Sequence, residues 1–260
     1  MLFKMRRWTL VGCVCATFGA TLAAQATTVP FTEDFTSDVA GWEDASNNPL
    51  AFESSGGVGG GGFARTSFNF FNFSSGFGGG PVLFRASASD NPSGGAFIGD
   101  WLADGVAAVT AWFRHDAPEP ITPFMRVATG FNFPGAVLAQ TQSVEAGVWT
   151  QITFAVDTSS PFCIGEGVTC AEAFQNVGNL QFGSDAPDGL VSQDTAFTFD
   201  IDRVSLVPVP EPGAALLLGL GLAGLGWSGG RKPRCATAGR TEPELGQDGS
   251  QPALGAQGAA

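Results

Sequence analysis

The sequence contains few of the side chains on which enzyme catalysis usually depends. Its 260 residues include no tyrosine and a single histidine, His115. A Ser-His-Asp or Cys-His mechanism would need this histidine as its base, but its setting in "WFRHDAPEP" is typical of a polar residue at a strand end. The GxSxG, HExxH and P-loop motifs are absent. We therefore predict that the protein is not an enzyme.

Positive charge is scarce in the body of the chain. Residues 8–230 hold five arginines, no lysine and 21 acidic residues, which gives a net charge of −16. A field of this sign repels nucleic acid and anionic lipid, so no nucleic-acid partner is predicted. Neutral sugars and divalent cations are compatible with it. Carboxylate pairs of the glycosidase kind occur in any chain this acidic, but none lies in a distinctive motif, so an extracellular glycan-acting enzyme is the least favoured class.

Residues 1–26 have the features of a secretory signal peptide. A basic start, "MLFKMRRW", precedes an apolar stretch, "TLVGCVCATFGATLA", that is too short to span a membrane comfortably. Ala24-Gln25-Ala26 supplies the small-x-small pattern that signal peptidase cleaves, so the mature chain is predicted to begin at Thr27 after export by the Sec translocon. A retained membrane anchor is the alternative, and it is disfavoured because no stop-transfer pattern follows.

The cysteines indicate one disulfide. Of the five cysteines, two leave with the signal peptide, and Cys235 lies beyond a long apolar segment. Cys163 and Cys170, in "CIGEGVTC", remain as an isolated pair in an exported domain, where a disulfide is the natural interpretation. Zinc binding is disfavoured, because two cysteines are too few ligands and His115 would make only a third.

A membrane-length apolar segment follows the body of the chain in "VPVPEPGAALLLGLGLAGLGWSGGRKPR". The prolines of residues 207–212 predict an extended linker. Residues 213–230 carry no charge, and at about 1.5 Å per residue they reach about 27 Å, enough for a single transmembrane helix across a thin bilayer. The basic cluster that begins residues 231–260 is typical of a cytoplasmic stop under the positive-inside rule, and the rest of that tail is predicted to be disordered. A buried core helix is disfavoured because this segment has no polar face.

The order of these three parts resembles the PEP-CTERM sorting signal of Gram-negative bacteria. Pro210, Glu211 and Pro212 are followed by the Gly/Ala/Leu segment and then by the basic cluster. The resemblance implies that an exosortase-type transpeptidase cuts near the Pro-Glu-Pro motif and releases the domain to the cell surface or the extracellular matrix. Family members usually end within a few residues of the basic cluster, whereas this chain continues for another 26 residues, "CATAGRTEPELGQDGSQPALGAQGAA".

Residues 27–206 are predicted to form one antiparallel β-sandwich. Short stretches of alternating apolar and polar residues are separated by Gly, Pro, Asp and Asn clusters, as in all-β domains. The predicted strands are residues 108–116, 124–131, 149–157, 179–183 and 196–207. In the third of these, Ile152 and Phe154 belong to the core face. In the last, the apolar residues change phase, which predicts a bulge near Asp202–Arg203.

Three stretches of this predicted sandwich region, taken in their order along the chain, resemble a known type of domain. "FTEDFTSDVAGWED" opens the region, "GVWTQITFAVD" lies two-thirds along, and "FDIDRVSLVPVP" closes it. Their order resembles the jelly-roll sandwich of carbohydrate-binding modules and of galactose-binding-like or concanavalin-like domains. Such modules often hold a structural calcium ion between their first and last strands. The resemblance implies calcium ligands, suited by their hard oxygen atoms, at Glu33, Asp34, Asp200 and Asp202. That these are merely solvated acids at strand ends is an equally supported alternative.

Sugar binding would need exposed aromatic rings beside hydrogen-bond donors. The predicted platform is Trp101, Trp112, Arg114 and Arg126. Alternation in "VTAWFRHD" puts Trp112 and Arg114 on one face and Phe113 on the other, so Trp112 points outward if Phe113 belongs to the core. The alternative, that Trp112 packs between the two sheets, is favoured because large aromatic side chains are usually buried.

Two Gly- and Phe-rich segments are unusual. Residues 56–62 read "GGVGGGG", and residues 69–80 read "NFFNFSSGFGGG". An aggregation-prone surface strand is one interpretation of the second segment. We favour a long loop packed on the sandwich with Phe68, Phe70 and Phe73 buried beneath it.

These patterns together predict an exported, non-enzymatic surface or matrix protein associated with extracellular polysaccharide. It would be anchored transiently in the inner membrane before sorting. A calcium-stabilised carbohydrate-binding module is the alternative.

Overall fold

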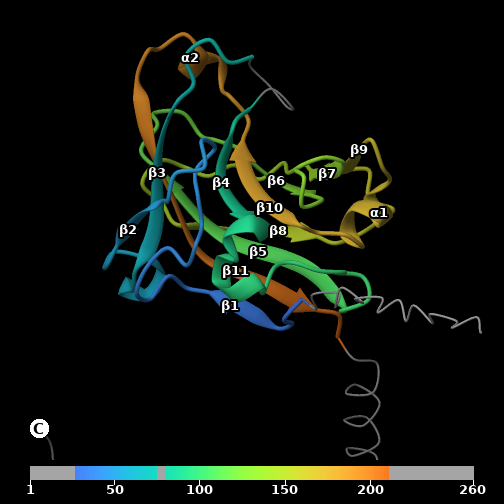
Figure 1. Ribbon diagram of the computed structural model, residues 1–260. Coiled ribbons are helices and arrows are strands. Elements are labelled where there is room, and N and C mark those ends of the chain that lie inside the picture. Colours follow the sequence, from blue (N-terminus) through green and yellow to red (C-terminus); the bar gives the residue numbers. More distant parts are fainter. Residues whose placement is uncertain (1–26, 75–79, 211–260) are drawn as a thin grey trace, which may run out of the picture. The chain divides into compact units, whose positions relative to one another are not determined.

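The computed structural model describes residues 27–74 and 80–210, and within them the chain forms two antiparallel sheets (Figure 1). The strands are β1 (Phe31–Glu33), β2 (Ala51–Glu53), β3 (Phe63–Asn69), β4 (Val82–Ser87), β5 (Val106–His115), β6 (Pro123–Ala128), β7 (Gly135–Leu138), β8 (Thr150–Ala155), β9 (Cys163–Glu166), β10 (Asn179–Ser184) and β11 (Ala196–Pro208). One sheet has the order β2-β3-β11-β5-β8, with β1 also paired to β11, and the other has the order β4-β10-β6-β7-β9.

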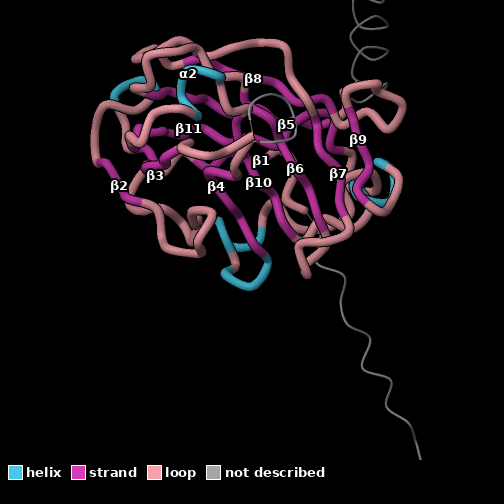
Figure 2. Tube along the Cα trace, turned by 90° about the horizontal axis from the view of Figure 1, so that it is seen from above, coloured by secondary structure: helices cyan, strands magenta, loops and turns pink. Residues whose placement is uncertain are grey.

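Helical structure in the described residues is short and lies at the margins of the strands (Figure 2). The helices are α1 (Cys170–Phe174) and α2 (Asp188–Val191), and 3₁₀ turns occupy Val58–Gly60, Ala88–Asp90 and Pro92–Gly95. The prediction of an all-β, antiparallel jelly-roll sandwich is therefore confirmed. The five strands predicted from alternation correspond to β5, β6, β8, β10 and β11.

Aromatic side chains from both sheets meet in the core. Phe182 of β10 lies 5.5 Å from Phe113 of β5 and 5.8 Å from Phe154 of β8, measured between ring centroids. Trp42 stacks on the same ring at 6.2 Å. Ile152 and Phe154, assigned to the core face from the sequence, are fully buried. Contacts of this kind join the two sheets into one hydrophobic core.

The long strand β11 carries the predicted bulge. Its register with β5 shifts between Asp202, which pairs with Trp112, and Ser205, which pairs with Thr110. Arg203 lies at the shift with a positive φ of 46°. The extra residue returns the apolar side chains of the second half of the strand to the core, as the phase change in the sequence indicated.

The Phe-rich segment after β3 packs into the core as predicted at Phe70, whereas the predicted burial of Phe73 is wrong. Phe70 is fully buried, and its ring lies 5.6 Å from that of Phe199. Phe68 packs against the core and contacts the rings of Phe70 and Phe73 at 5.4 and 5.2 Å. Phe73 itself is 38% exposed, so it covers Phe68 rather than entering the core.

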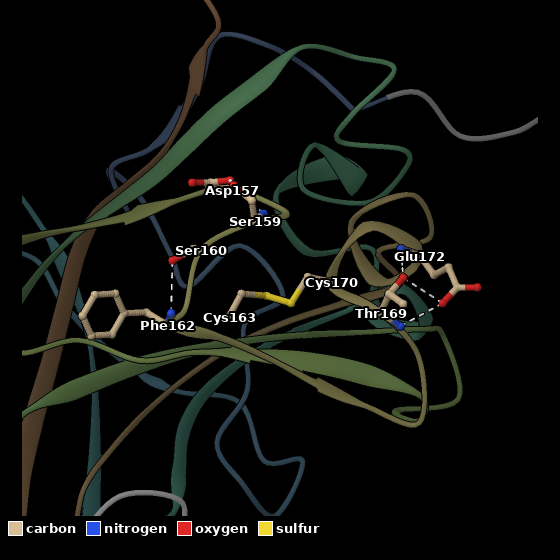
Figure 3. The surroundings of a disulfide bond; sticks show 8 residues. All are labelled: Asp157, Ser159, Ser160, Phe162, Cys163, Thr169, Cys170 and Glu172. Atoms are coloured by element: carbon tan, nitrogen blue, oxygen red, sulfur yellow. Dashed lines mark hydrogen bonds between the residues drawn. A yellow bond between two sulfur atoms is a disulfide. The ribbon is translucent and has the colours of Figure 1, made fainter.

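The predicted disulfide joins Cys163 of β9 to Cys170 of α1 (Figure 3). Helix α1 begins with a capping box, in which Thr169 and Glu172 each accept a hydrogen bond from the other's backbone N–H. The ring of Phe162 points away from the sulfur atoms and is 52% exposed. The bridge and the cap together fix the short edge strand β9 to the helix that follows it.

The contacts within the chain divide it into two compact units, with the sandwich in one and the sorting segment in the other. One compact unit is Met1–Val209 and the other is Pro210–Ala260. Among the described residues, no helix has the length and apolar character needed to cross a membrane. The predicted signal peptide (residues 1–26), membrane segment (213–230) and tail (231–260) lie outside the described residues.

Candidate functional site

A buried carboxylate lies at the centre of the outer face of the β2-β3-β11-β5-β8 sheet. Asp200 of β11 pairs in register with Arg65 of β3 on one side and Arg114 of β5 on the other. Its two oxygens accept from Arg65 Nε at 2.7 Å and Arg114 Nη2 at 2.8 Å. Asp200 is 3% exposed, so the two guanidinium groups supply the compensation that a buried charge needs. The hydrogen bond to Asp200 also raises the pKa of Arg65.

Aromatic rings extend this cluster along the same face. The Arg114 guanidinium lies 4.5 Å from the ring centroid of Trp149 and 4.9 Å from that of Phe63, and Arg65 lies 5.0 Å from Phe63. Cation–π contacts of this kind hold the arginine planes against the rings. The result is a polar and aromatic surface in which ion pairs and ring contacts hold both arginine side chains.

The Gly-rich loop of residues 56–62 is fastened to this surface. The carbonyl of Gly56 accepts from Arg114 Nη1 at 3.2 Å and from Trp149 Nε1 at 3.0 Å. Asp202 Oδ2 accepts from the backbone N–H of Val58 at 2.7 Å. A Cβ on Gly57 would lie 2.7 Å from that same oxygen, so the loop can approach the strand only without a side chain there. Burial raises the pKa of Asp202.

The four acids predicted to bind calcium have different roles in the structure. Asp200 is held by two arginines, and Glu33 Oε1 accepts from the backbone N–H of Phe35 at 2.9 Å. Asp34 is exposed, and its charge adds to the rise in the pKa of Asp202. In residues 27–74 and 80–210, no three His, Cys, Asp or Glu side chains are grouped to hold a metal ion.

The four-residue calcium set is therefore not assembled, because the register of β11 places Asp200 between two cations. Calcium binding itself stays a prediction, and melting with and without a chelator would test it.

Trp112 and Arg114 lie on the outer face, as alternation predicted. Phe113 is in the core at 4% exposure, and Trp112 is partly exposed between Asp202 of β11 and Gln151 of β8. The favoured alternative, in which Trp112 packs between the sheets, is wrong. The core side of β5 is already filled by Phe113 and its neighbours.

The other two residues of the predicted sugar platform lie elsewhere. Trp101 is fully buried, donates from Nε1 to the carbonyl of Phe97 at 2.9 Å and stacks on Phe174. Its assignment to a sugar platform is wrong, because its ring faces are covered by protein. Arg126 belongs to β6 of the other sheet and donates from Nε to Glu166 at 2.6 Å. The platform thus reduces to Trp112 and Arg114.

Beside Arg114 lies a polar cavity of about 330 Å³. Its lining is Arg65, Arg114, His115, Asp116, Gly147, Thr198 and Asp200. Sequence reasoning found Arg114 but missed Arg65, Thr198 and Asp116, which reach the cavity from three different segments. The only signal in the sequence was the rarity of arginine, and that becomes informative only when the strand register is known.

His115 is not arranged as a catalytic base. It is 2% exposed, its Nε2 bonds the carbonyl of Val144 at 2.8 Å, and its ring stacks on Phe199. Among the described residues, Nδ1 has no hydrogen-bond partner, so no carboxylate orients this ring and no nucleophile is joined to it. The histidine closes the core at the end of β5.

A PEP-CTERM protein-sorting motif matches residues 208–232. The chain therefore carries this motif, as its Pro-Glu-Pro sequence predicted. No curated protein matches the chain.

Several solved structures are similar in fold. The CBM22-1–GH10 modules of Clostridium thermocellum endo-1,4-β-D-xylanase 10B, complexed with xylohexaose, match at 14% identity and a TM-score of 0.40. That match covers 69% of this chain and 28% of the xylanase chain. The CBM22-1 xylan-binding domain of Paenibacillus barcinonensis Xyn10C matches at 10% identity and a TM-score of 0.41. That match covers 72% of this chain and 100% of the xylan-binding domain. The family 11 carbohydrate-binding module of Clostridium thermocellum Lic26A-Cel5E matches at 12% identity and a TM-score of 0.42. That match covers 72% of this chain and 98% of the module. At these identities the likeness concerns the fold alone.

Proposed function

We propose that this protein is exported, and that an exosortase-type transpeptidase cuts it near Pro210-Glu211-Pro212 and releases the sandwich to the cell surface or the extracellular matrix. The sorting motif at residues 208–232 carries this proposal. Its position supports it further. Strand β11 ends at Pro208, and Val209 makes the last described backbone hydrogen bond, to Gly105 at 2.7 Å. A cut at the motif would leave every described strand on the released side.

The released domain would act without catalysis, as a component of the polysaccharide-containing matrix. The structural use of His115 supports a non-enzymatic role, because this residue is the single histidine of the chain. The net charge of −16 over residues 8–230 favours a surface that stays soluble and does not bind nucleic acid.

The test is the intact mass and location of the protein in its native host. We expect a C-terminus near Pro212, with the apolar segment and tail missing, in the surface or medium fraction. Replacing Pro210 and Pro212 together by alanine should leave the uncut chain in the inner membrane. A full-length wild-type product retained there would overturn the proposal.

Glycan binding by the outer face of the six-stranded sheet is a second candidate. It is favoured by the partly exposed Trp112 beside Arg114 and the adjoining polar cavity of about 330 Å³. A tryptophan face with fixed donors next to it suits a sugar ring, which presents an apolar face and equatorial hydroxyl groups. The acidic body favours a neutral glycan over an anionic one.

A glycan array followed by retention on the best polysaccharide tests this candidate. Trp112→Ala should lower retention at least tenfold, about 1.4 kcal/mol. Phe131→Ala is the matched control, because Phe131 is an aromatic residue that is 96% exposed on the β6–β7 loop of the other sheet. Equal retention by wild type and a folded Trp112→Ala variant would dismiss this site.

A further inference from the structure

One turn of the sandwich binds both ends of the described domain. This segment, Asp100–Gly105, is called the terminal turn below. The backbone nitrogen of Thr27 donates to Asp104 Oδ2 at 2.7 Å. At the other end, the backbone nitrogen of Val209 donates to the carbonyl of Gly105 at 2.7 Å. The first residue after the predicted signal peptide and the last residue before Pro-Glu-Pro are thus held by adjacent residues.

The terminal turn is anchored in the core and capped from within. Trp101 is fully buried and bonds Phe97 through its indole nitrogen. The carboxylate of Asp100 accepts two backbone N–H groups of the same turn, at 3.1 and 3.0 Å. Gly105 has a φ of +72°, which a residue with a side chain rarely adopts. The turn is therefore a fixed support for whatever it binds.

Thr27 is part of the fold at its own position. It is 8% exposed, and its hydroxyl donates to the carbonyl of Ile98 at 3.3 Å. The next residue, Thr28, donates from its backbone to Ala96 at 3.1 Å. The nitrogen of Thr27 is consequently held beside the Asp104 carboxylate whether or not a residue precedes it.

Signal-peptide removal changes the chemistry of that nitrogen. Hydrolysis of the Ala26–Thr27 peptide bond by water leaves the carboxyl group on Ala26 and gives the hydrogen to the nitrogen of Thr27. A neutral amide thereby becomes an amino group with an ordinary pKa of about 8, which is protonated at neutral pH.

We propose that processing turns this contact into an ion pair, in which the α-ammonium group of Thr27 binds Asp104 and secures the terminal turn that also holds Val209. A charge-assisted hydrogen bond is about twice as strong as a neutral one. The ion pair requires signal-peptide removal, which is part of the proposed export, but it does not require the exosortase step.

The surrounding charges favour the ammonium form. The titratable residues lining the adjoining cavity of about 600 Å³ are Asp100 and Asp104. No charged side chain comes from residues 96–98, to which Thr27 and Thr28 bond, from residues 175–178 of the cavity lining, or from residues 207–209. Asp104 therefore faces the new amine, Asp100 lies in the same turn, and none of these segments supplies a positive charge.

The absence of lysine from residues 8–230 makes this amine directly measurable. In the protein processed at both ends, the α-amine of Thr27 is the one amine that an amine-selective acylating reagent can label. The rate of labelling against pH, read by mass spectrometry, gives its pKa. We expect an N-terminus at Thr27 and a pKa above about 8. Asp104→Asn should lower that pKa by about 1.

Two further variants keep the test decisive. Asp188→Asn removes an exposed acid of α2 and should leave the pKa unchanged. Insertion of one glycine before Thr27 keeps Asp104 but moves the amine away, so its pKa should fall even if Asp104→Asn does not fold. Equal pKa values in the wild type, Asp104→Asn and the glycine-insertion form, or a mature N-terminus elsewhere, would overturn the proposal. A failure of C-terminal sorting would be seen separately, in the C-terminal mass.

Discussion

Asp200 shows how a few charged side chains organise one face of the sheet. Its carboxylate is 3% exposed and joins Arg65 and Arg114, which come from strands on either side. Because Arg114 also holds Gly56, removing the carboxylate would loosen the Gly-rich loop as well as the two strands.

We expect Asp200→Asn to lower the free energy of unfolding by about 2 kcal/mol. Loss of one partner from a buried ionic group is costly, and the partial exposure of both arginines reduces that cost. Urea unfolding of the variant and the wild type gives the value. Asp188→Asn, at an exposed position, should change it by less than about 0.5 kcal/mol. Equal stability of the two variants would show that the arginines need no buried partner.

Asp202 makes folding stability depend on pH in the opposite direction to most aspartates, whose pKa is lowered by folding. Burial is the largest influence on this carboxyl and raises its pKa in the folded protein. The folded state therefore binds its proton more tightly than the unfolded state, and stability falls as pH rises above about 4 through the raised folded pKa. In Asp202→Asn this loss is absent. We expect the melting temperature of the variant, relative to wild type, to rise between about pH 4 and pH 7. A constant difference across that range would contradict the assignment.

Residue-level predictions from the sequence succeeded where a regular strand sets the direction of side chains. Alternation in β5 is unbroken and indicated the outer face for Trp112 and Arg114, whereas the favoured prediction from side-chain size, that Trp112 packs between the sheets, was wrong. Trp101 was misplaced because it lies in a turn, where no period tells an inward ring from an outward one. The partners of Asp200 were missed because they depend on the register of three strands, which local sequence does not specify.

At the scale of elements, the short edge strand β9 depends on its disulfide. Cys163 and Cys170 are seven positions apart and tie this four-residue strand to α1. Closing so small a loop restricts the unfolded chain, and the expected stabilisation is about 2.5 kcal/mol.

Reduction of the bridge should therefore lower the stability of the domain by that amount. Melting with and without a reductant measures it. The double variant Cys163→Ser, Cys170→Ser is the control, because it should melt like the reduced wild type and ignore the reductant. A wild type that melts identically under both conditions would show that β9 is held by its pairing with β7 alone.

Most of the longer strands could be predicted from the sequence, and the shortest could not. β5, β8 and β11 span enough residues for a period of two to be seen, and the phase change in β11 even located its bulge. The sequence analysis also missed β3 and β4, which have seven and six residues. The other unpredicted strands, β1, β2, β7 and β9, have three or four residues each. A stretch that short shows no period, and it becomes a strand because a neighbouring strand offers hydrogen bonds.

At the scale of the whole molecule, the fold and the sorting segment meet at a sharp boundary. The sandwich was predicted from alternating stretches separated by Gly, Pro, Asp and Asn clusters, and the two terminal segments from their apolar stretches and basic residues. The contact between the chain ends and the terminal turn could not be predicted, because it joins residues far apart in sequence. The last contacts of β11 are Val207 and Pro208 paired with Ala108 and Val106, followed by the hydrogen bond of Val209.

This boundary predicts where the chain can be cut without loss of the fold. A domain ending at Pro212 keeps every contact of β11, so it should unfold at the same urea concentration as one that continues through residue 234. A domain ending at Leu206 lacks the last strand pairs and the bond to Gly105. At about 1 kcal/mol for each hydrogen bond lost, it should be less stable by about 2 kcal/mol. If both truncations unfold together, the strand end contributes nothing and the terminal turn is not its support. If the longer one is already destabilised, residues beyond Pro212 belong to the fold, and release by sorting would weaken the domain.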